Sequence, residues 1–168
     1  MNPGYANAVE APALLSARRT SERGFMQALS FQLHATLQED THILVDLPEI
    51  YILLHKNAFI PWVILVPKTT TETDFMNVSF EEQQQWLQIS RKISGFIKQY
   101  FKIQKINFAA IGNVVSQLHL HIVGRQTTDC IWPQPVWGHL HQSKAYDAKE
   151  VSDISVALKS FMAHSVKG

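Results

Sequence analysis

The sequence predicts an α+β fold: a five-stranded antiparallel sheet with one long helix, followed by a C-terminal helix. Short apolar segments bounded by turn residues indicate the strands, and a stretch with a 3.6-residue apolar period indicates the helix. The order of these elements is three strands, a long helix and two more strands. A length of 168 residues suits one domain with a sizeable core.

The first three strands are expected close together in the chain, at residues 42–46, 50–54 and 61–67. Leu47-Pro48 ends the first strand, and a short connection over 56–58 precedes the third. The third strand is almost wholly apolar and is closed by Pro67. Such continuous apolar runs are typical of strands that are buried on both faces.

The long helix has a readable start, because Ser79 stands three residues before Glu82 in a capping-box pattern. Its apolar residues repeat with helical spacing to about Phe101. Two further strands are expected at 106–111 and 117–123, with a Gly112-Asn113 loop between them. Residues 131–138 are expected to be irregular but packed, and a last helix to start near Asp147.

Composition along the chain predicts three parts. Residues 1–25 are rich in Ala, Ser, Gly and Pro without periodicity, so we expect a flexible N-terminal extension. Residues 26–142 form the main domain, and residues 143–168 a helical segment packed on it.

Charge and cysteine usage limit the partners and the compartment. A net charge of +1 does not favour a nucleic acid polymer held by bulk electrostatics. No apolar run reaches membrane-spanning length, so we expect no membrane partner. The single cysteine, Cys130, excludes an intramolecular disulfide and favours the reducing cytoplasm. Charged residues are only 17% of the chain, which favours a surface partly hidden between subunits.

Residues 117–125 carry the pattern with the most chemical content. Side chains alternate along a strand, so Gln117, His119 and His121 should share one face while the leucines between them enter the core. Three interpretations are open. The histidines are a paired, half-buried polar face, or two ligands of a metal, or they include a nucleophile acting on phosphorus.

The metal interpretation needs further ligands. His-x-His suits zinc, but a catalytic site usually needs three protein ligands. His55, His139 and His141 are the candidates to complete it. No carboxylate or cysteine stands at a recognisable ligand spacing, so we expect no metal and no other cofactor.

The phosphorus interpretation gains weight from a resemblance. Residues 117–123 resemble the motif of the histidine triad (HIT) family, His-x-His-x-His-x-x, with Gln117 at the first histidine. The resemblance extends to Asn107 on the preceding strand, to the apolar strand ending in Pro67-Lys68, and to Gly124-Arg125-Gln126 followed by Trp132-Pro133. It covers roughly residues 30–138.

The resemblance implies a mechanism. His119 matches the middle histidine, which attacks the α-phosphorus of a nucleoside phosphate derivative and forms a nucleotidyl-histidine intermediate. Its other nitrogen is expected to be held by an acceptor such as a backbone carbonyl. His121 matches the third histidine and would contact phosphate oxygens. Gln117 would hold a phosphate oxygen beside them.

The resemblance also implies binding residues and an assembly. Asn107 would orient the site, and we assign Asn113, Lys68 and Arg125 to substrate binding as well. The family binds the nucleoside in an apolar cleft, for which Ile43, Leu53 and Leu54 are the candidate lining residues. Family members commonly form homodimers with a continuous sheet and need no metal.

The chain departs from the family pattern at three positions. Gln117 replaces the first histidine and Trp62 a further family histidine, while Val114 stands at a serine of related hydrolases. Neither Gln nor Trp relays a proton near neutral pH. We therefore expect a nucleotide hydrolase or nucleotidyl transferase acting through His119. The alternatives are a non-catalytic nucleotide-binding or interaction protein, and a metal-dependent hydrolase using His119 and His121.

Overall fold

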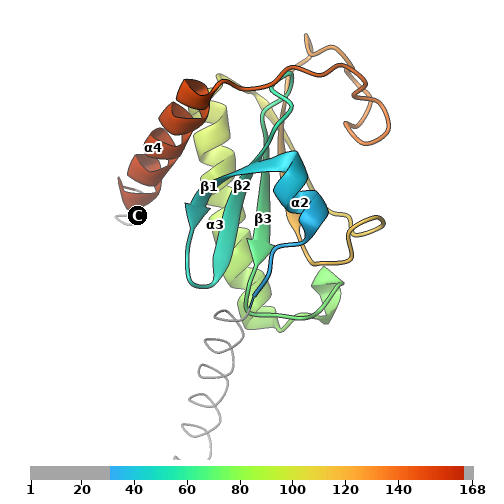
Figure 1. The fold of residues 1–168 in the computed structure, drawn as a ribbon, viewed down its shortest axis with the longest axis vertical. Helices are drawn as coiled ribbons and strands as arrows, with labels where there is room; N and C mark the ends of the chain where they lie inside the picture. Colours follow the sequence, from blue (N-terminus) through green and yellow to red (C-terminus); the bar gives the residue numbers. More distant parts are fainter. Residues whose placement is uncertain (1–30, 165–168) are drawn as a thin grey trace, which may run out of the picture.

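The computed structural model of the protein describes residues 31–164, so the extension predicted for residues 1–25 lies outside the described residues. Five antiparallel strands form one sheet in the order β1-β2-β3-β5-β4 (Figure 1). This confirms the predicted fold class. The elements are α2 (Ala35–Asp40), β1 (Thr41–Asp46), β2 (Ile50–His55), β3 (Trp62–Pro67), a 3₁₀ helix η1 (Phe75–Asn77), α3 (Phe80–Tyr100), β4 (Lys105–Ala110), β5 (Leu120–Arg125) and α4 (Ala148–His164).

Both long helices begin where the sequence predicts, and at each start the first capping residue and the residue three positions later hydrogen-bond to each other. At α3, Ser79 Oγ accepts from the Glu82 amide at 3.4 Å, while the Glu82 carboxylate accepts from Ser79 Oγ at 2.7 Å. At α4, the Asp147 and Glu150 side chains accept from each other's backbone amides at 2.7 and 2.8 Å. Local sequence therefore fixes the starts of both helices.

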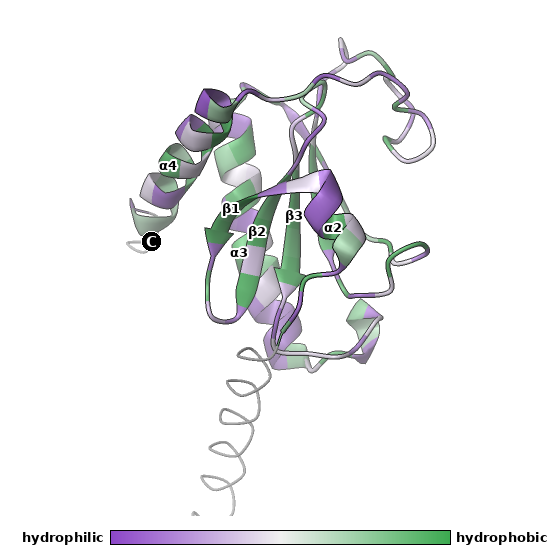
Figure 2. Cartoon of the chain, viewed as in Figure 1, coloured by the Kyte–Doolittle hydropathy of each residue, from purple (hydrophilic) through white to green (hydrophobic). Residues whose placement is uncertain are grey.

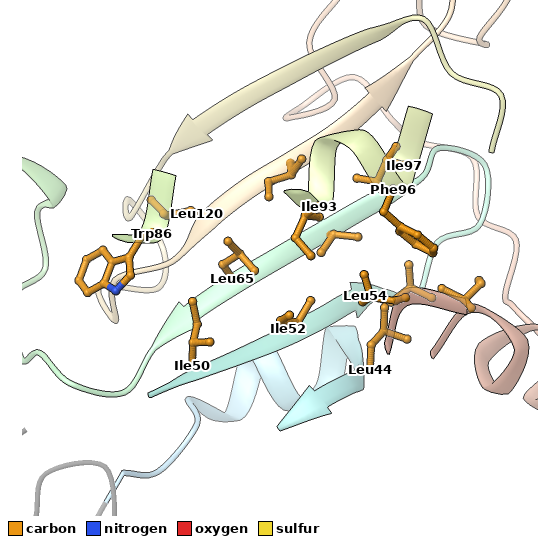
Figure 3. Packing of buried hydrophobic residues seen from close by; sticks show 14 of the residues in the cluster. Leu44, Ile50, Ile52, Leu54, Leu65, Trp86, Ile93, Phe96, Ile97 and Leu120 are labelled. Atoms are coloured by element: carbon orange, nitrogen blue, oxygen red, sulfur yellow. The ribbon is translucent and has the colours of Figure 1, made fainter. Parts of the chain in front are cut away.

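One face of the sheet packs against α3 and α4, and this is the larger hydrophobic core (Figure 3). Ile52, Leu54 and Leu65 of the sheet meet Ile93 and Ile97 of α3 there. Helix α3 approaches β5 so closely that a Cβ added at Gly124 would lie 2.8 Å from a methyl of Ile97. Gly124 therefore lets the helix lie directly on the strand that carries the histidines.

On the opposite face of the sheet lies α2 (Figure 1). The segment 131–140 is irregular as predicted, but it packs there only through Val136 and a few partly buried side chains, while most of its residues are exposed. Leu33 and Leu37 pack there with Leu53, and Val136 reaches the same cluster. The colouring in Figure 2 shows apolar strands between these two layers, while α2 also carries polar residues. The central strands β3 and β5 are thus buried on both faces, and the histidines belong to the face under α2.

The structure differs from the prediction mainly at β5, which begins at Leu120 rather than at residue 117. The register explains the shift, because both neighbouring strands pair with β5 only from Leu120 onward. Helices α2 and η1 were not predicted, since each is a single short turn without an apolar period. None of the helices in residues 31–164 is long and apolar enough to cross a bilayer.

Candidate active site

His119 directly precedes β5 and His121 is its second residue, and both side chains point to the same face of the sheet. Their ring centroids are 4.7 Å apart, with the rings edge to face. Leu118, Leu120 and Ile122 point to the other face, into the core under α3. The predicted alternation is therefore confirmed, and it places two imidazoles side by side on a rigid strand.

The His119 ring is held by its own chain. Its Nδ1 lies 2.6 Å from the backbone carbonyl oxygen of Gln117, so Nδ1 carries the proton and donates it. This confirms the predicted carbonyl partner. Burial lowers the pKa of His119; the Gln117 carbonyl opposes that shift, and the charge of His34 adds to it. A neutral ring with Nδ1–H leaves the lone pair on Nε2, the arrangement that a nucleophile needs.

His119 lines a cavity of about 440 Å³ that lies between the β4–β5 loop and the segment before η1. Asn113 and Ser116 line it from the loop, and Asp74 from the opposite side. The predicted Asn113 therefore lies in the same cavity as the nucleophile candidate, whereas Ser116 was not predicted. The cavity lining includes no lysine or arginine, so a phosphate would meet amide, hydroxyl and imidazole groups together with the carboxylate of Asp74.

His121 is bound by Trp62, the residue that stands at a family histidine. The Trp62 indole Nε1–H donates to His121 Nδ1 at 3.0 Å, and both side chains are buried. Burial lowers the pKa of His121 to about 3; the charges of His119 and His55 act in the same direction, and a hydrogen bond to the Ile111 backbone opposes them. His121 is therefore neutral near pH 7 and offers no positive charge to a phosphate.

Aromatic rings surround this pair. His55 stacks on Trp62 with centroids 4.4 Å apart and planes 12° from parallel. Trp137 meets Trp62 and His121 edge to face, at 5.8 and 5.3 Å. The irregular segment 131–140 thus reaches the site through Trp137.

Gln117 binds the chain before α2 at both ends of its amide. Its Oε1 accepts from the His34 backbone amide, and its Nε2 donates to the Gln32 carbonyl, each at 2.9 Å. The prediction that Gln117 holds a phosphate oxygen is not supported by this geometry. Gln117 instead fixes residues 32–34 against the site, while its own carbonyl orients His119.

The metal interpretation is not supported by the arrangement of nitrogen atoms. His119 Nδ1 faces a carbonyl and His121 Nδ1 faces the Trp62 indole, so the pair does not present two lone pairs to one point. Within residues 31–164, no group of three or more potential ligands comes together.

Arg125 and Asn107 bind each other instead of facing the cavity. The Arg125 guanidinium, 1% exposed, makes two hydrogen bonds to Asp129 at 2.7 and 3.0 Å and a third to Asn107 Oδ1 at 3.1 Å. These contacts tie β4, β5 and the following turn together. The substrate-binding prediction for Arg125 is therefore corrected, because its buried guanidinium is held by Asp129 and Asn107 and does not line the cavity.

Lys68 is also engaged elsewhere. Its ammonium group forms an ion pair with Asp46 and lies over the Tyr51 ring, 3.7 Å from the centroid. Lys68 is 6% exposed. These contacts lie at the β1–β2 end of the sheet, so the predicted phosphate contact is corrected to a structural ion pair.

The three residues predicted to line the nucleoside cleft lie in different surroundings. Leu53 and Leu54 are fully buried in the two cores, so neither lines an open cleft. Ile43 is 54% exposed and lines a second cavity of about 650 Å³. Its other lining residues are Phe31, Gln32, Leu33, Gln38, Thr41 and Tyr51.

The sequence did not point to Ser116 in the cavity or to His34 near His119. It pointed to Trp62 and Gln117, but not to the hydrogen bonds that they make. Only Ser116 carried a local signal, because it directly precedes the motif. The other three gain their roles from contacts between distant parts of the chain.

Comparisons with known proteins agree with this geometry. The model of the HIT domain family matches residues 36–128. A histidine triad protein from Bradyrhizobium japonicum is 39% identical, with a TM-score of 0.71 over 77% of this chain and 96% of that one. A histidine triad protein from Marinobacter aquaeolei is 35% identical, with a TM-score of 0.73 over 80% and 97%. A comparison with curated proteins found no match.

Proposed function

Because the chain belongs to the histidine triad (HIT) family, we propose that it is a nucleotide-binding hydrolase or nucleotidyl transferase with His119 as its nucleophile. Its substrates would be nucleoside phosphates, phosphoramidates or dinucleotides, attacked at the α-phosphate. The observation that carries this proposal is the 2.6 Å contact between His119 Nδ1 and the Gln117 carbonyl. That contact leaves Nε2 as the reactive nitrogen beside a cavity.

The reaction would run in two displacements. His119 Nε2 gives its lone pair to the α-phosphorus, and the bond to the leaving group breaks with the electron pair going to that group. The imidazolium formed keeps donating Nδ1–H to the Gln117 carbonyl, which stabilises its positive charge. Water, or another acceptor, then attacks phosphorus and releases His119.

The neighbouring groups would bind the phosphate as neutral donors. Asn113 and Ser116 line the same cavity as His119, and their amide and hydroxyl groups donate hydrogen bonds. The His121 ring, neutral near pH 7, would add no positive charge.

The second cavity is the candidate site for the base. Phe31 and Tyr51 line it with ring centroids 6.0 Å apart, and Gln32 and Gln38 add amide groups. Aromatic rings and amides are suited to stacking on a base and to binding its edge. Gln32 also accepts a hydrogen bond from Gln117, so this cavity adjoins the segment that is fixed to the site.

One observation favours a second candidate function, nucleotide binding without turnover. Gln117 and Trp62 do not carry protons near neutral pH, and both are engaged with other parts of the chain. A protein with these replacements would bind a nucleotide and release it unchanged.

The test is intact-protein mass spectrometry after brief incubation with adenylyl and guanylyl compounds, quenched without acid because phosphohistidine is acid-labile. The proposal predicts a nucleotidyl-sized mass increase that His119→Asn abolishes. His139→Asn is the matched control, because His139 Nδ1 also lies 3.0 Å from a carbonyl two residues earlier but is exposed on another segment. Binding by calorimetry without adduct or turnover would favour the second candidate.

Three other inferences stay predictions: the homodimer, the cytoplasmic location and the division of the chain at residues 25 and 142. Analytical ultracentrifugation of the full chain tests the first.

A further inference from the structure

The contact between Trp62 and His121 restricts the proton positions on the imidazole. An indole N–H is a donor only, so the His121 Nδ1 that receives it at 3.0 Å must hold a lone pair. The proton of the neutral ring is then on Nε2. Trp62 is 8% exposed and His121 6%, so water does not easily replace this bond.

The second nitrogen of His121 faces the loop that lines the His119 cavity. The Ile111 backbone is a hydrogen-bonding partner that opposes the lowering of the His121 pKa, and Ile111 is one of the cavity-lining residues. Because Nδ1 is occupied, this bond is made by Nε2–H donating to the carbonyl. The one N–H of the neutral ring is thus used on the loop at the edge of the cavity.

The surroundings disfavour a second proton on the ring. The titratable groups that act on His121 are the imidazoles of His119 and His55, and both oppose positive charge on it. Trp137 covers it edge to face. A proton on Nδ1 would set two N–H groups against each other across the Trp62 contact.

We propose that Trp62 is a positioning residue that fixes His121 as the Nε2–H tautomer, so that His121 donates to the loop at the cavity edge and does not act as a proton carrier. The fixed tautomer is a property of the folded chain and does not require turnover. Its consequence for the reaction rests on the proposed function. The leaving group would then depart without a proton from His121, and groups that are stable as anions would be favoured.

The test is long-range ¹H–¹⁵N correlation NMR of the histidine rings in the full chain between pH 7.5 and 4.5. We expect Nε2–H on His121 with an unprotonated Nδ1, and no titration over this range. Trp62→Phe keeps an aromatic ring against His55 but removes the donor. We expect it to yield an appreciable fraction of the Nδ1–H tautomer and to raise the titration midpoint.

Trp137→Phe is the matched control, because it also removes an indole that contacts the His121 ring. It should leave the tautomer unchanged. If Trp62→Phe does not fold, a scalar coupling between Trp62 Nε1 and His121 Nδ1 in the unmodified protein reports the same hydrogen bond. Nδ1–H on His121 in the unmodified protein, or an unchanged tautomer in folded Trp62→Phe, would overturn the proposal. Neither NMR readout depends on nucleotide chemistry. Failure of the proposed function would be seen in a different experiment, as the absence of a nucleotidyl adduct on His119.

Discussion

The two faces of the sheet are built in different ways. Under α3, the contacts are between aliphatic and aromatic side chains, as in Figure 3, and none of them requires a particular partner. Under α2, the imidazoles of His119 and His121 have defined partners, Gln117 and Trp62. A buried apolar side chain needs only to fill space, whereas each buried ring nitrogen needs a donor or an acceptor. The second face is therefore the one where a single substitution changes chemistry rather than only stability.

The largest expected effect lies on the histidine face. His119→Asn should lower kcat on the order of 10⁵-fold or more, because it removes the nucleophile. Its melting temperature should stay close to that of the unmodified protein, since a small polar residue beside a cavity leaves the apolar core intact. Steady-state kinetics and thermal unfolding measure the two effects. Retained turnover in His119→Asn would remove this residue from the mechanism.

The apolar face should show the reverse behaviour. Leu120→Ala should lower the free energy of unfolding by about 3 kcal/mol, because it leaves a cavity where a fully buried side chain packs against α3. Val156→Ala, on the exposed side of α4, is the control and should cost less than about 0.5 kcal/mol. Urea unfolding measures both. Equal losses in the two variants would show that the α3 face is not the main source of stability.

Acid should lower the free energy of unfolding, because the unfolded chain binds a proton at His121 more readily than the fold does. The pKa of His121 is about 3 in the fold against 6.5 when unperturbed, so the unfolded chain binds the proton more readily. The contribution of neutral His121 to the free energy of unfolding is fully present above pH 6.5 and is lost as the pH falls toward 3. Between pH 7 and 5 this amounts to about 2 kcal/mol of unfolding free energy.

Urea unfolding at several pH values tests this expectation. His121→Gln should be less sensitive to acid than the unmodified protein over that interval. His164→Gln, in which an exposed histidine at the end of α4 is replaced, should match the unmodified protein. Identical pH profiles for all three would contradict a neutral His121.

The smallest effect is expected at Gln117, whose two amide hydrogen bonds lie near the surface. Gln117→Ala should cost about 1 kcal/mol of stability and speed hydrogen exchange at the His34 amide, which loses its acceptor. Gln134→Ala, at an exposed position, is the control and should leave that amide unchanged. An unaltered exchange rate in Gln117→Ala would show that the amide bonds do not hold residues 32–34.

The sequence predicted what is local. Capping boxes at Ser79 and Asp147, the apolar strands and the alternation around His119 are short-range patterns, and the structure confirms them. The sequence did not reveal which residues far apart in the chain would hydrogen-bond to each other. Trp62 and His121 are 59 residues apart, and Gln117 and Gln32 are 85 apart.

The contacts of cationic residues at strand ends were likewise not predictable from the sequence. From the sequence, Lys68 and Arg125 were candidates for substrate binding. Asp46 and Asp129 neutralise them in the fold, where both cations are buried. Such pairing depends on tertiary packing, because Asp46 and Lys68 meet only when β1, β2 and β3 are side by side.

The Gln117 amide also determines how short this chain can be made. A version that starts at Ala35 would keep every strand, both long helices and the two histidines, and would look complete by its regular elements. It would lack Gln32 and His34, the two residues that Gln117 binds. Gln117 also supplies the carbonyl that orients His119, so trimming the chain there amounts to an alteration of the site itself.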